Sequence, residues 1–448
     1  MSVIAHCRGR RNPGDAGPRW AALGLLGWLS LVVASCAGPA PQPAREPVPT
    51  VPVVVGEPAG MPTLLIAQAQ FDERTDPSGE VVIMPGPAKL TVATLDESRW
   101  RAEIVEDPDS NVFHKAMWFR QPDRPPGIVT IGGNEAPAPA LLKLWRPEES
   151  GWRGEALTAA TFGHRFNRFR DVEAGDVDGD GVPELVVGTH DTGVVAIVRR
   201  ADGETWSAEV IDSAAATFVH EIELGDLDGD GAIEIYATPT APNRLDHGLQ
   251  PGRIVQYTHS ETGWSAAAIM AWDDRHAKEI TVADVDRDGR QELLAAVEQP
   301  AVGNSSSRQV EIIRVDHTQA GWSHNQVALL PAPGCRSLVV GDIDGDGWNE
   351  VVAGCGRTGV WLLEPGVRWS VARLDPAATS VETAVTLGDL DRDGVQEIYV
   401  AADDVRRVIR YRRRDAGFDR TELLELAPNA MTFGIEACLT DLAGPDHP

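Results

Sequence analysis

A short apolar run recurs along the chain, each time shortly after an acidic, glycine-containing segment. The acidic residues 176–181 precede the apolar run 185–187, and residues 351–354 form the corresponding run of a later copy. Short apolar runs bounded by turn residues are typical of buried strands. Around the first copy we assign four strands, with Gly and Asp at the turns, to residues 170–175, 184–188, 192–199 and 206–212. The pattern therefore predicts an all-β chain assembled from a repeated four-stranded unit.

A second marker of this unit is an aromatic residue at the start of its last strand. The marker occurs at Trp100, Trp152, Trp206, Trp264, Trp322, Trp369 and Phe418, at spacings of 47 to 58 residues. Periods near 50 residues with several short strands are typical of β-propeller blades, and we expect each marker to pack between neighbouring blades. Residues 432–441 resemble one more first strand, which should pair with the first blade and close the ring. We therefore predict a seven-bladed β-propeller over residues 62–448.

The acidic segment has the pattern D-x-D-x-D-G-x-x-E and occurs five times, beginning at Asp176, Asp226, Asp284, Asp342 and Asp389. Asp at positions 1, 3 and 5 puts three carboxylates on the inside of one turn, and such oxygen ligands suit a hard cation such as Ca²⁺. Gly at position 6 makes the sharp turn without strain. Position 12, where an EF-hand carries a bidentate Glu, is an apolar strand residue here, and the acid stands at position 9. We therefore predict about five strand-loop-strand calcium sites; five copies in phase argue against a bare acidic turn.

The candidate ligands occupy positions 1, 3, 5, 7 and 9 of each loop. They are Asp176, Asp178, Asp180, Val182 and Glu184; Asp226, Asp228, Asp230, Ala232 and Glu234; Asp284, Asp286, Asp288, Arg290 and Glu292; Asp342, Asp344, Asp346, Trp348 and Glu350; and Asp389, Asp391, Asp393, Val395 and Glu397. The Glu at position 9 coordinates either directly or through a water.

The five loops resemble those of the FG-GAP or VCBS repeats found in integrin alpha-chain propellers and in many bacterial surface proteins. The resemblance implies that each repeat is one blade and that the loop joins the first two strands of the blade and holds Ca²⁺. The uniform Glu at position 9 departs from the family, which often has Asp there. The first two repeats keep the four-stranded pattern but have no acidic loop, because residues 71–76 and 121–127 lack the spacing of acids and glycine that the loop requires.

The N-terminal segment predicts export. Arginines precede an apolar run at residues 20–33 that is too short to span a membrane, which is the pattern of a signal peptide over residues 1–35. Residues 33–36 resemble a lipobox, which implies that Cys36 is lipidated; ordinary cleavage that leaves a free Cys36 is the alternative. Residues 36–61 are rich in proline and are expected to form a stiff tether. We expect a lipoprotein anchored to the bacterial cell envelope, at the outer membrane or the cell surface.

The net charge limits the possible partners, and the spacing of two cysteines suggests a disulfide. The formal net charge of -27 argues against binding to nucleic acid. Cys335 and Cys355 flank the fourth acidic loop almost symmetrically, so a hairpin would place them opposite one another. Export permits a disulfide between them, and two buried free thiols are the alternative.

The register of the repeats also predicts a ligand site. Six residues before the first loop Asp stand Arg170, His220, Lys278 and Arg336, and five residues before it stand Asp171, Glu221 and Glu279. With a rise of about 3.3 Å per residue along a strand, these residues lie about 20 Å from the acidic loops. First strands lie innermost in propellers of the family that the loops resemble, so these side chains should converge on the central channel, with His164, His276 and residues 243–247 as a candidate rim. Salt bridges between neighbouring blades are the alternative.

The sequence shows no nucleophile motif, phosphate loop or zinc spacing. We favour a non-enzymatic module that binds a protein or a glycan. One alternative is an enzyme, such as a polysaccharide lyase or hydrolase, because some propellers of this repeat type are catalytic. The other is a purely structural envelope protein.

Overall fold

The computed structural model describes residues 60–75, 79–122, 124–163, 165–201, 205–242, 249–300, 308–415 and 417–442. The chain divides after residue 56, and all of the described residues belong to the unit 57–448. The predicted signal segment, residues 36–59 of the tether with Cys36, His164 and residues 243–247 lie outside the described residues, and Met61, predicted as the end of the tether, already belongs to the first strand.

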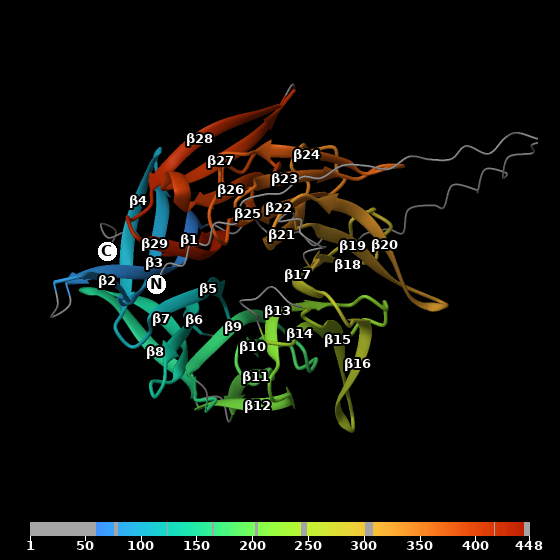
Figure 1. Ribbon diagram of the computed structural model, residues 1–448, viewed down its shortest axis with the longest axis horizontal. Coiled ribbons are helices and arrows are strands. Elements are labelled where there is room, and N and C mark those ends of the chain that lie inside the picture. Colours follow the sequence, from blue (N-terminus) through green and yellow to red (C-terminus); the bar gives the residue numbers. More distant parts are fainter. Residues whose placement is uncertain are drawn as a thin grey trace, which may run out of the picture. The chain divides into compact units, whose positions relative to one another are not determined.

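The described strands form seven antiparallel blades of four strands each (Figure 1). Four blades are separate sheets, while the first three are joined into a 13-stranded sheet by short pairings of β1 with β5 and of β6 with β9. From the innermost strand outward, blade 1 contains β29 (Ala430–Thr440), β1 (Met61–Thr75), β3 (Ala88–Asp96) and β4 (Arg99–Asp107); blade 2 contains β5 (Val112–Phe119), β6 (Gly127–Glu135), β7 (Ala140–Glu148) and β8 (Gly151–Ala160); and blade 3 contains β9 (Phe166–Gly175), β10 (Glu184–Thr189), β11 (Val194–Ala201) and β12 (Thr205–Ser213). Blade 4 contains β13 (Phe218–Gly225), β14 (Glu234–Thr240), β15 (Gly252–Ser260) and β16 (Gly263–Trp272), and blade 5 contains β17 (His276–Ala283), β18 (Glu292–Glu298), β19 (Val310–Thr318) and β20 (Gly321–Leu330). Blade 6 contains β21 (Cys335–Gly341), β22 (Glu350–Cys355), β23 (Gly359–Glu364) and β24 (Ser370–Asp375), and blade 7 contains β25 (Ala384–Gly388), β26 (Glu397–Ala402), β27 (Arg407–Arg414) and β28 (Gly417–Glu425).

Two further elements decorate the blades. The strand β2 (Val81–Pro85) pairs with the end of β1, and the 3-10 helix η1 (Asp403–Val405) follows β26. In the described part of the chain, no helix has the length and apolar character needed to cross a membrane.

The last strand closes the ring, as the sequence predicts. The strand β29 runs antiparallel to β1 from the pair Met61 and Thr440 to the pair Gln70 and Ala430. Its innermost position in blade 1 lets it contact both β25 of blade 7 and β5 of blade 2. The contacts then continue from β5 through β9, β13, β17 and β21 to β25, so the unit 57–448 closes on itself.

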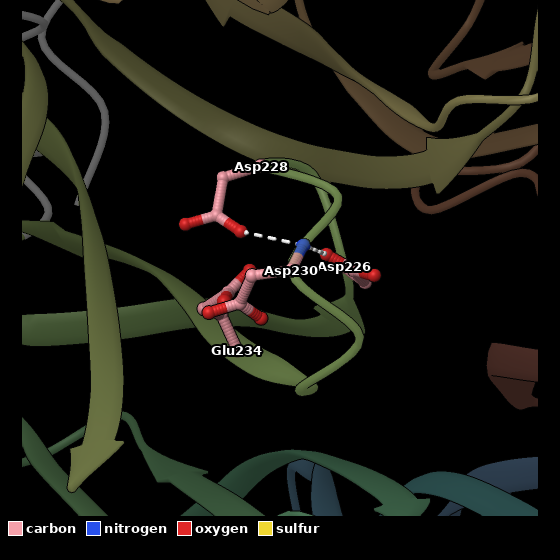
Figure 2. Close-up of side chains that lie close together, drawn as sticks. All are labelled: Asp226, Asp228, Asp230 and Glu234. Atoms are coloured by element: carbon pink, nitrogen blue, oxygen red, sulfur yellow. Dashed lines mark hydrogen bonds between the residues drawn. The ribbon is translucent and has the colours of Figure 1, made fainter.

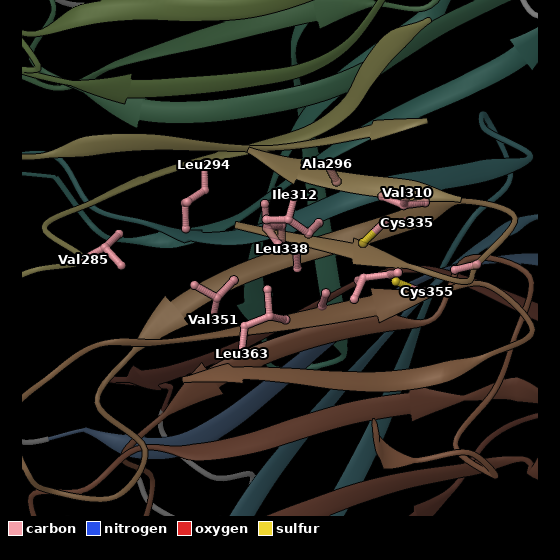
Figure 3. Packing of buried hydrophobic residues seen from close by; sticks show 14 residues of the cluster. Val285, Leu294, Ala296, Val310, Ile312, Cys335, Leu338, Val351, Cys355 and Leu363 are labelled. Carbon is pink, nitrogen blue, oxygen red and sulfur yellow. The ribbon is translucent and has the colours of Figure 1, made fainter. Parts of the chain in front are cut away.

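The core lies between the blades, and all seven aromatic markers pack there as predicted. Each marker packs, partly buried, against a different cluster of buried side chains. Trp369, for example, borders the cluster between blades 5 and 6, where Leu294 faces Leu338 and Val351 (Figure 3). Apolar side chains on the two faces of each sheet therefore join each blade to both of its neighbours.

The register of blade 6 places Cys335 directly opposite Cys355, as the spacing predicts. Both are buried free thiols in the structure, so the expected disulfide is not formed. Cys438 is also a free thiol and is partly buried.

Candidate functional site

The five acidic loops join the first two strands of blades 3 to 7, and each brings carboxylates together (Figure 2). In all five loops, oxygen atoms of the side chains at positions 1, 3 and 9 lie within 4.8 Å of one another. The aspartate at position 5 joins this group in blades 4 and 5, as Asp230 and Asp288. Its counterparts Asp180, Asp346 and Asp393 do not belong to the groups found among the described residues. The structure therefore places five clusters that could hold a metal ion where the sequence predicts them.

The loop backbone explains why the clusters form. In blades 3, 4, 5 and 7 the N–H of the glycine at position 6 donates to the position-1 carboxylate, for example from Gly181 to Asp176 at 2.8 Å; in blade 6 Gly345 at position 4 donates to Asp342 at 2.7 Å. The N–H at position 7 donates to the position-5 carboxylate at 2.7 to 3.1 Å, from Val182, Ala232, Arg290, Trp348 and Val395. The glycine at position 6 has a positive φ, +86° at Gly181, as the sequence suggested. Position 4 also has a positive φ in every loop, which the sequence analysis overlooked; Gly179 shows it at 78° and Arg287 at 60°.

The glutamate at position 9 is buried in all five loops, and its Oε2 accepts a hydrogen bond in each. The backbone N–H of Val177 donates to Oε2 of Glu184 at 3.1 Å, and the Tyr236 hydroxyl donates to Oε2 of Glu234 at 3.0 Å. Oε1 of Glu234 is buried without a hydrogen-bond partner. The same holds for Oε1 of Glu397, Oδ1 of Asp176 and Oδ1 of Asp286. Orphaned carboxylate oxygens among other carboxylates fit a hard cation, which would satisfy them.

Burial, aided by the charge of nearby loop aspartates, raises the pKa of each position-9 glutamate to about 7, whereas hydrogen bonds from backbone N–H groups or a tyrosine hydroxyl lower it. The glutamates concerned are Glu184, Glu234, Glu292, Glu350 and Glu397. A bound cation would favour their ionised form.

A cavity of about 310 Å³ occupies the centre of the ring. Its wall includes residues of the innermost strands of all seven blades, from β5, β9, β13, β17, β21, β25 and β29. Five of the predicted site residues line it: Arg170, Asp171, Glu221, Glu279 and Arg336. The strands that the repeat register selects therefore do meet at one cavity.

The other two predicted residues, His220 and Lys278, are buried and do not line the cavity in the described structure. They lie against one another, with Nζ of Lys278 2.9 Å from Nε2 of His220. Burial, then the charge of Arg336, lowers the pKa of Lys278 to about 7. His276, a predicted rim residue, is buried beside His220, with ring centroids 6.1 Å apart. Its placement at a rim was wrong.

The sequence analysis missed further lining residues. Glu173 and Glu223 stand three residues before the first loop Asp. They are therefore two positions along the strand from Asp171 and Glu221, on the same face, and this period was a usable signal. Lys115 comes from blade 2, which has no acidic loop from which a register could be counted.

The cations of the wall are partly engaged between blades. Nζ of Lys115 lies 2.9 Å from Oδ1 of Asp171 and also pairs with Glu173. Arg336 pairs with Glu298, and its Nε lies 3.2 Å from Oε2 of Glu382. Inter-blade salt bridges, the alternative that the sequence left open, are therefore part of this wall.

Three carboxyl groups of the wall form a row across blades 3, 4 and 5. Asp171, Glu221 and Glu279 all line the cavity, and Glu221 feels the charges of Asp171 and Glu279. Burial, then the charges of Asp171 and Glu279, raises the pKa of Glu221 well above its usual range. Burial also raises the pKa of Glu279 to about 8, against the charges of Arg170 and Arg336. With the pKa values of Glu221 and Glu279 raised in this way, the row is partly protonated near neutral pH.

The chain was compared with known proteins. The family model of the FG-GAP-like repeat matches residues 176–237, 284–353 and 342–400, so residues 176–400 carry FG-GAP-like repeats. No curated protein matches the sequence.

Solved structures share the fold. Two proteins provisionally assigned as 6-phosphogluconolactonases are similar, from Bacteroides fragilis NCTC 9343 (10% identity, 85% of this chain and 98% of that chain covered) and Bacteroides uniformis ATCC 8492 (11%, 85% and 100%), each with a TM-score of 0.51. The periplasmic gluconolactonase of Pseudomonas aeruginosa matches with 12% identity, coverage of 84% and 99%, and a TM-score of 0.51. At these identities the likeness concerns the fold alone.

Proposed function

We propose that this chain is an envelope lipoprotein whose calcium-stabilised propeller binds a polar protein or glycan ligand in its central cavity. The cavity carries the proposal. Its wall holds six carboxyl groups, from Asp171, Glu173, Glu221, Glu223, Glu279 and Glu436, against the three cations Lys115, Arg170 and Arg336. Five of the six carboxyl groups lie on blades 3 to 5, while Leu338, Val339, Val385 and Ile435 contribute apolar surface from blades 6, 7 and 1.

Such a wall suits a ligand with one polar and one apolar face. Carboxyl groups accept hydrogen bonds from hydroxyl or ammonium groups, and the apolar side can pack against a carbon skeleton. A sugar ring has both features, as does a lysine side chain of a protein partner. The acidic cavity does not suit nucleic acid.

The five loops would hold Ca²⁺, about five ions in all, and would stabilise the ring rather than bind the ligand. The donor set supports calcium, because it consists of aspartate and glutamate oxygens at the spacing of the FG-GAP-like repeat. The anchor would be the lipidated Cys36, with residues 36–61 as a tether that lifts the ring from the envelope membrane.

The proposal is tested with the unit 57–448, which closes on itself. It would be applied to a glycan array and to immobilised envelope proteins, in calcium and again in a chelator. The double variant Arg170→Met and Glu221→Gln changes two lining residues, and Glu261→Gln, at an exposed turn, is the matched control. We expect the double variant to lose binding while it keeps its fold and calcium content. Undiminished binding would place the ligand site elsewhere.

A second candidate function is hydrolysis or elimination on a sugar-derived substrate. The row formed by Asp171, Glu221 and Glu279 in the cavity wall favours it, because neighbouring carboxyl groups whose pKa values are shifted in opposite directions can act as general acid and base. His220 and Lys278, two side chains of the predicted ligand site that could act as bases, lie outside the cavity wall and do not support it. Turnover of polysaccharides or of sugar lactones by the unit 57–448, lost in Glu279→Gln, would establish this function. If no ligand and no turnover are found, a structural role remains.

A further inference from the structure

Three of the five acidic loops contain an arginine from the third strand of their own blade. In blade 3, Nη1 of Arg199 lies 2.6 Å from Oδ2 of Asp178. In blade 5, Nη2 of Arg314 lies 2.7 Å from Oδ2 of Asp286 and 3.2 Å from Oε1 of Glu292.

Blade 7 repeats the arrangement. Nη1 of Arg412 lies 2.7 Å from Oδ2 of Asp391, and the same guanidinium also pairs with Asp393. In all three blades the arginine therefore contacts the aspartate at position 3, which is one of the candidate metal ligands.

The strand register shows why these arginines reach the loops. In blade 3, Val198 faces the second residue of β10, and Arg199 follows it along the strand. In blade 7, Tyr411 faces the second residue of β26, and Arg412 follows it. In blade 5, Arg314 comes two residues before the position of β19 that corresponds to Arg199. Residues two apart on a strand project from the same face, so Arg314 points to the same side of its blade as Arg199 does.

Blades 4 and 6 carry no cation on this face. The two corresponding positions are Gln256 and Thr258 in blade 4, and Leu362 and Glu364 in blade 6. Among the described contacts, no lysine or arginine side chain pairs with a loop carboxylate of these two blades. Arg287 of blade 5 approaches the loop of blade 6, but it donates to the backbone oxygen of Asp346, at 3.4 Å.

We propose that Arg199, Arg314 and Arg412 are internal counter-ions that divide the calcium loops into two classes, weak sites in blades 3, 5 and 7 and tight sites in blades 4 and 6. The inference rests on the proposed binding of calcium to the loops. The charge of the donor set controls calcium affinity, and a guanidinium on a ligand carboxylate removes one negative charge from the site. The same guanidinium replaces part of the charge of the ion, so the loops of blades 3, 5 and 7 stay neutralised when calcium is low.

The two classes alternate around the ring, because a tight loop lies between each pair of weak loops. Calcium at low concentration would therefore occupy blades 4 and 6 first. The remaining three sites would fill only at higher concentration.

The test is a calorimetric calcium titration of the calcium-free unit 57–448, with bound ions counted by native mass spectrometry. We expect about two ions to bind at least about tenfold more tightly than about three others. The triple variant Arg199→Gln, Arg314→Gln and Arg412→Gln should merge the two classes by raising the affinity of the weak sites. Arg407→Gln is the matched control, because Arg407 lies on the same strand as Arg412 but pairs with Glu422.

The outcomes separate this inference from the proposed function. If neither wild type nor variant binds calcium, the calcium proposal itself fails. If wild type binds five ions with one affinity, or if the triple variant keeps the two classes, calcium binding stands and the arginine inference fails. A triple variant whose weak sites become still weaker would also overturn it, because the arginines would then position the carboxylates rather than compete with the ion.

Discussion

Replacing Glu279 with Gln should change how the stability of the propeller depends on pH. Glu279 is 6% exposed and lines the central cavity together with Glu221. Burial raises its pKa from 4.5 to about 8, with Arg170 and Arg336 opposing the shift and Asp171 adding to it. The folded protein therefore binds this proton more tightly than the unfolded chain does. Gln is similar in shape to the protonated carboxyl group but cannot lose the proton.

The sign and size of the effect follow from this shift. A raised pKa contributes stability that is present in full below about pH 4.5 and is lost as the pH rises through about 8. At about 1.4 kcal/mol per pKa unit, the loss for this one group reaches at most about 5 kcal/mol across that range. Because Glu221 and Glu279 influence each other's charge, part of the loss belongs to the pair. We therefore expect Glu279→Gln to be stabilised relative to wild type by about 2 to 4 kcal/mol more at pH 8.5 than at pH 5.

The measurement is chemical unfolding of the unit 57–448 from pH 5 to pH 8.5 in saturating calcium, for wild type, Glu279→Gln and the exposed control Glu261→Gln. Taking the difference between variant and wild type removes groups that titrate in both proteins. One of these is Lys278, whose pKa is lowered to about 7 and whose contribution runs in the opposite direction, being lost as the pH falls. A difference between Glu279→Gln and wild type that does not grow with pH would refute the reasoning, and it would mean that Glu279 is ionised without cost in the folded protein.

Three further predictions concern the ring. Chelation should lower the melting temperature, because millimolar Ca²⁺ adds about 0.4 to 1.4 kcal/mol per site at affinities of about 10⁻⁴ to 10⁻³ M; an unchanged melting temperature would contradict the calcium loops. Thiol titration of the unfolded unit 57–448 should find three free thiols, from Cys335, Cys355 and Cys438, whereas one would show that the pair in blade 6 is oxidised. Deleting residues 430–448 should expose the edge of β1 and cause aggregation that light scattering detects, and a monomeric deletion variant of unchanged stability would disprove the role of β29.

The repeat of the fold could be predicted because its signals are local. Loop glycines, apolar runs and the aromatic marker at about 50-residue spacing each report on one blade. The closing strand could be predicted as well, since the leftover residues 432–441 repeat the pattern of a first strand and β29 covers most of them. The oxidation state of Cys335 and Cys355 could not be, because the register brings them together whether or not they are bonded.

Only some residues of the central cavity could be predicted from the sequence, for a similar reason. Counting back from the loops places residues such as Asp171 and Glu221, because strand rise converts sequence distance into height. The same count fails for Lys115, whose blade has no loop, and it does not reveal which way Lys278 points. Arg199 escaped notice because its contact with Asp178 depends on how the third strand pairs with the second.

The composition of the cavity wall argues against a purely structural protein. Burying carboxyl groups next to one another raises the pKa of Glu221, Glu223 and Glu279, which means that their ionisation destabilises the fold. Apolar side chains of similar volume would fill the same space without this cost, and Leu338 and Ile435 do so on blades 6 and 1. A propeller with a purely structural role would be more stable with apolar residues throughout the cavity wall. The excess of carboxyl groups over Lys115, Arg170 and Arg336 supports the proposed ligand site, because a ligand could supply further hydrogen-bond donors or positive charge.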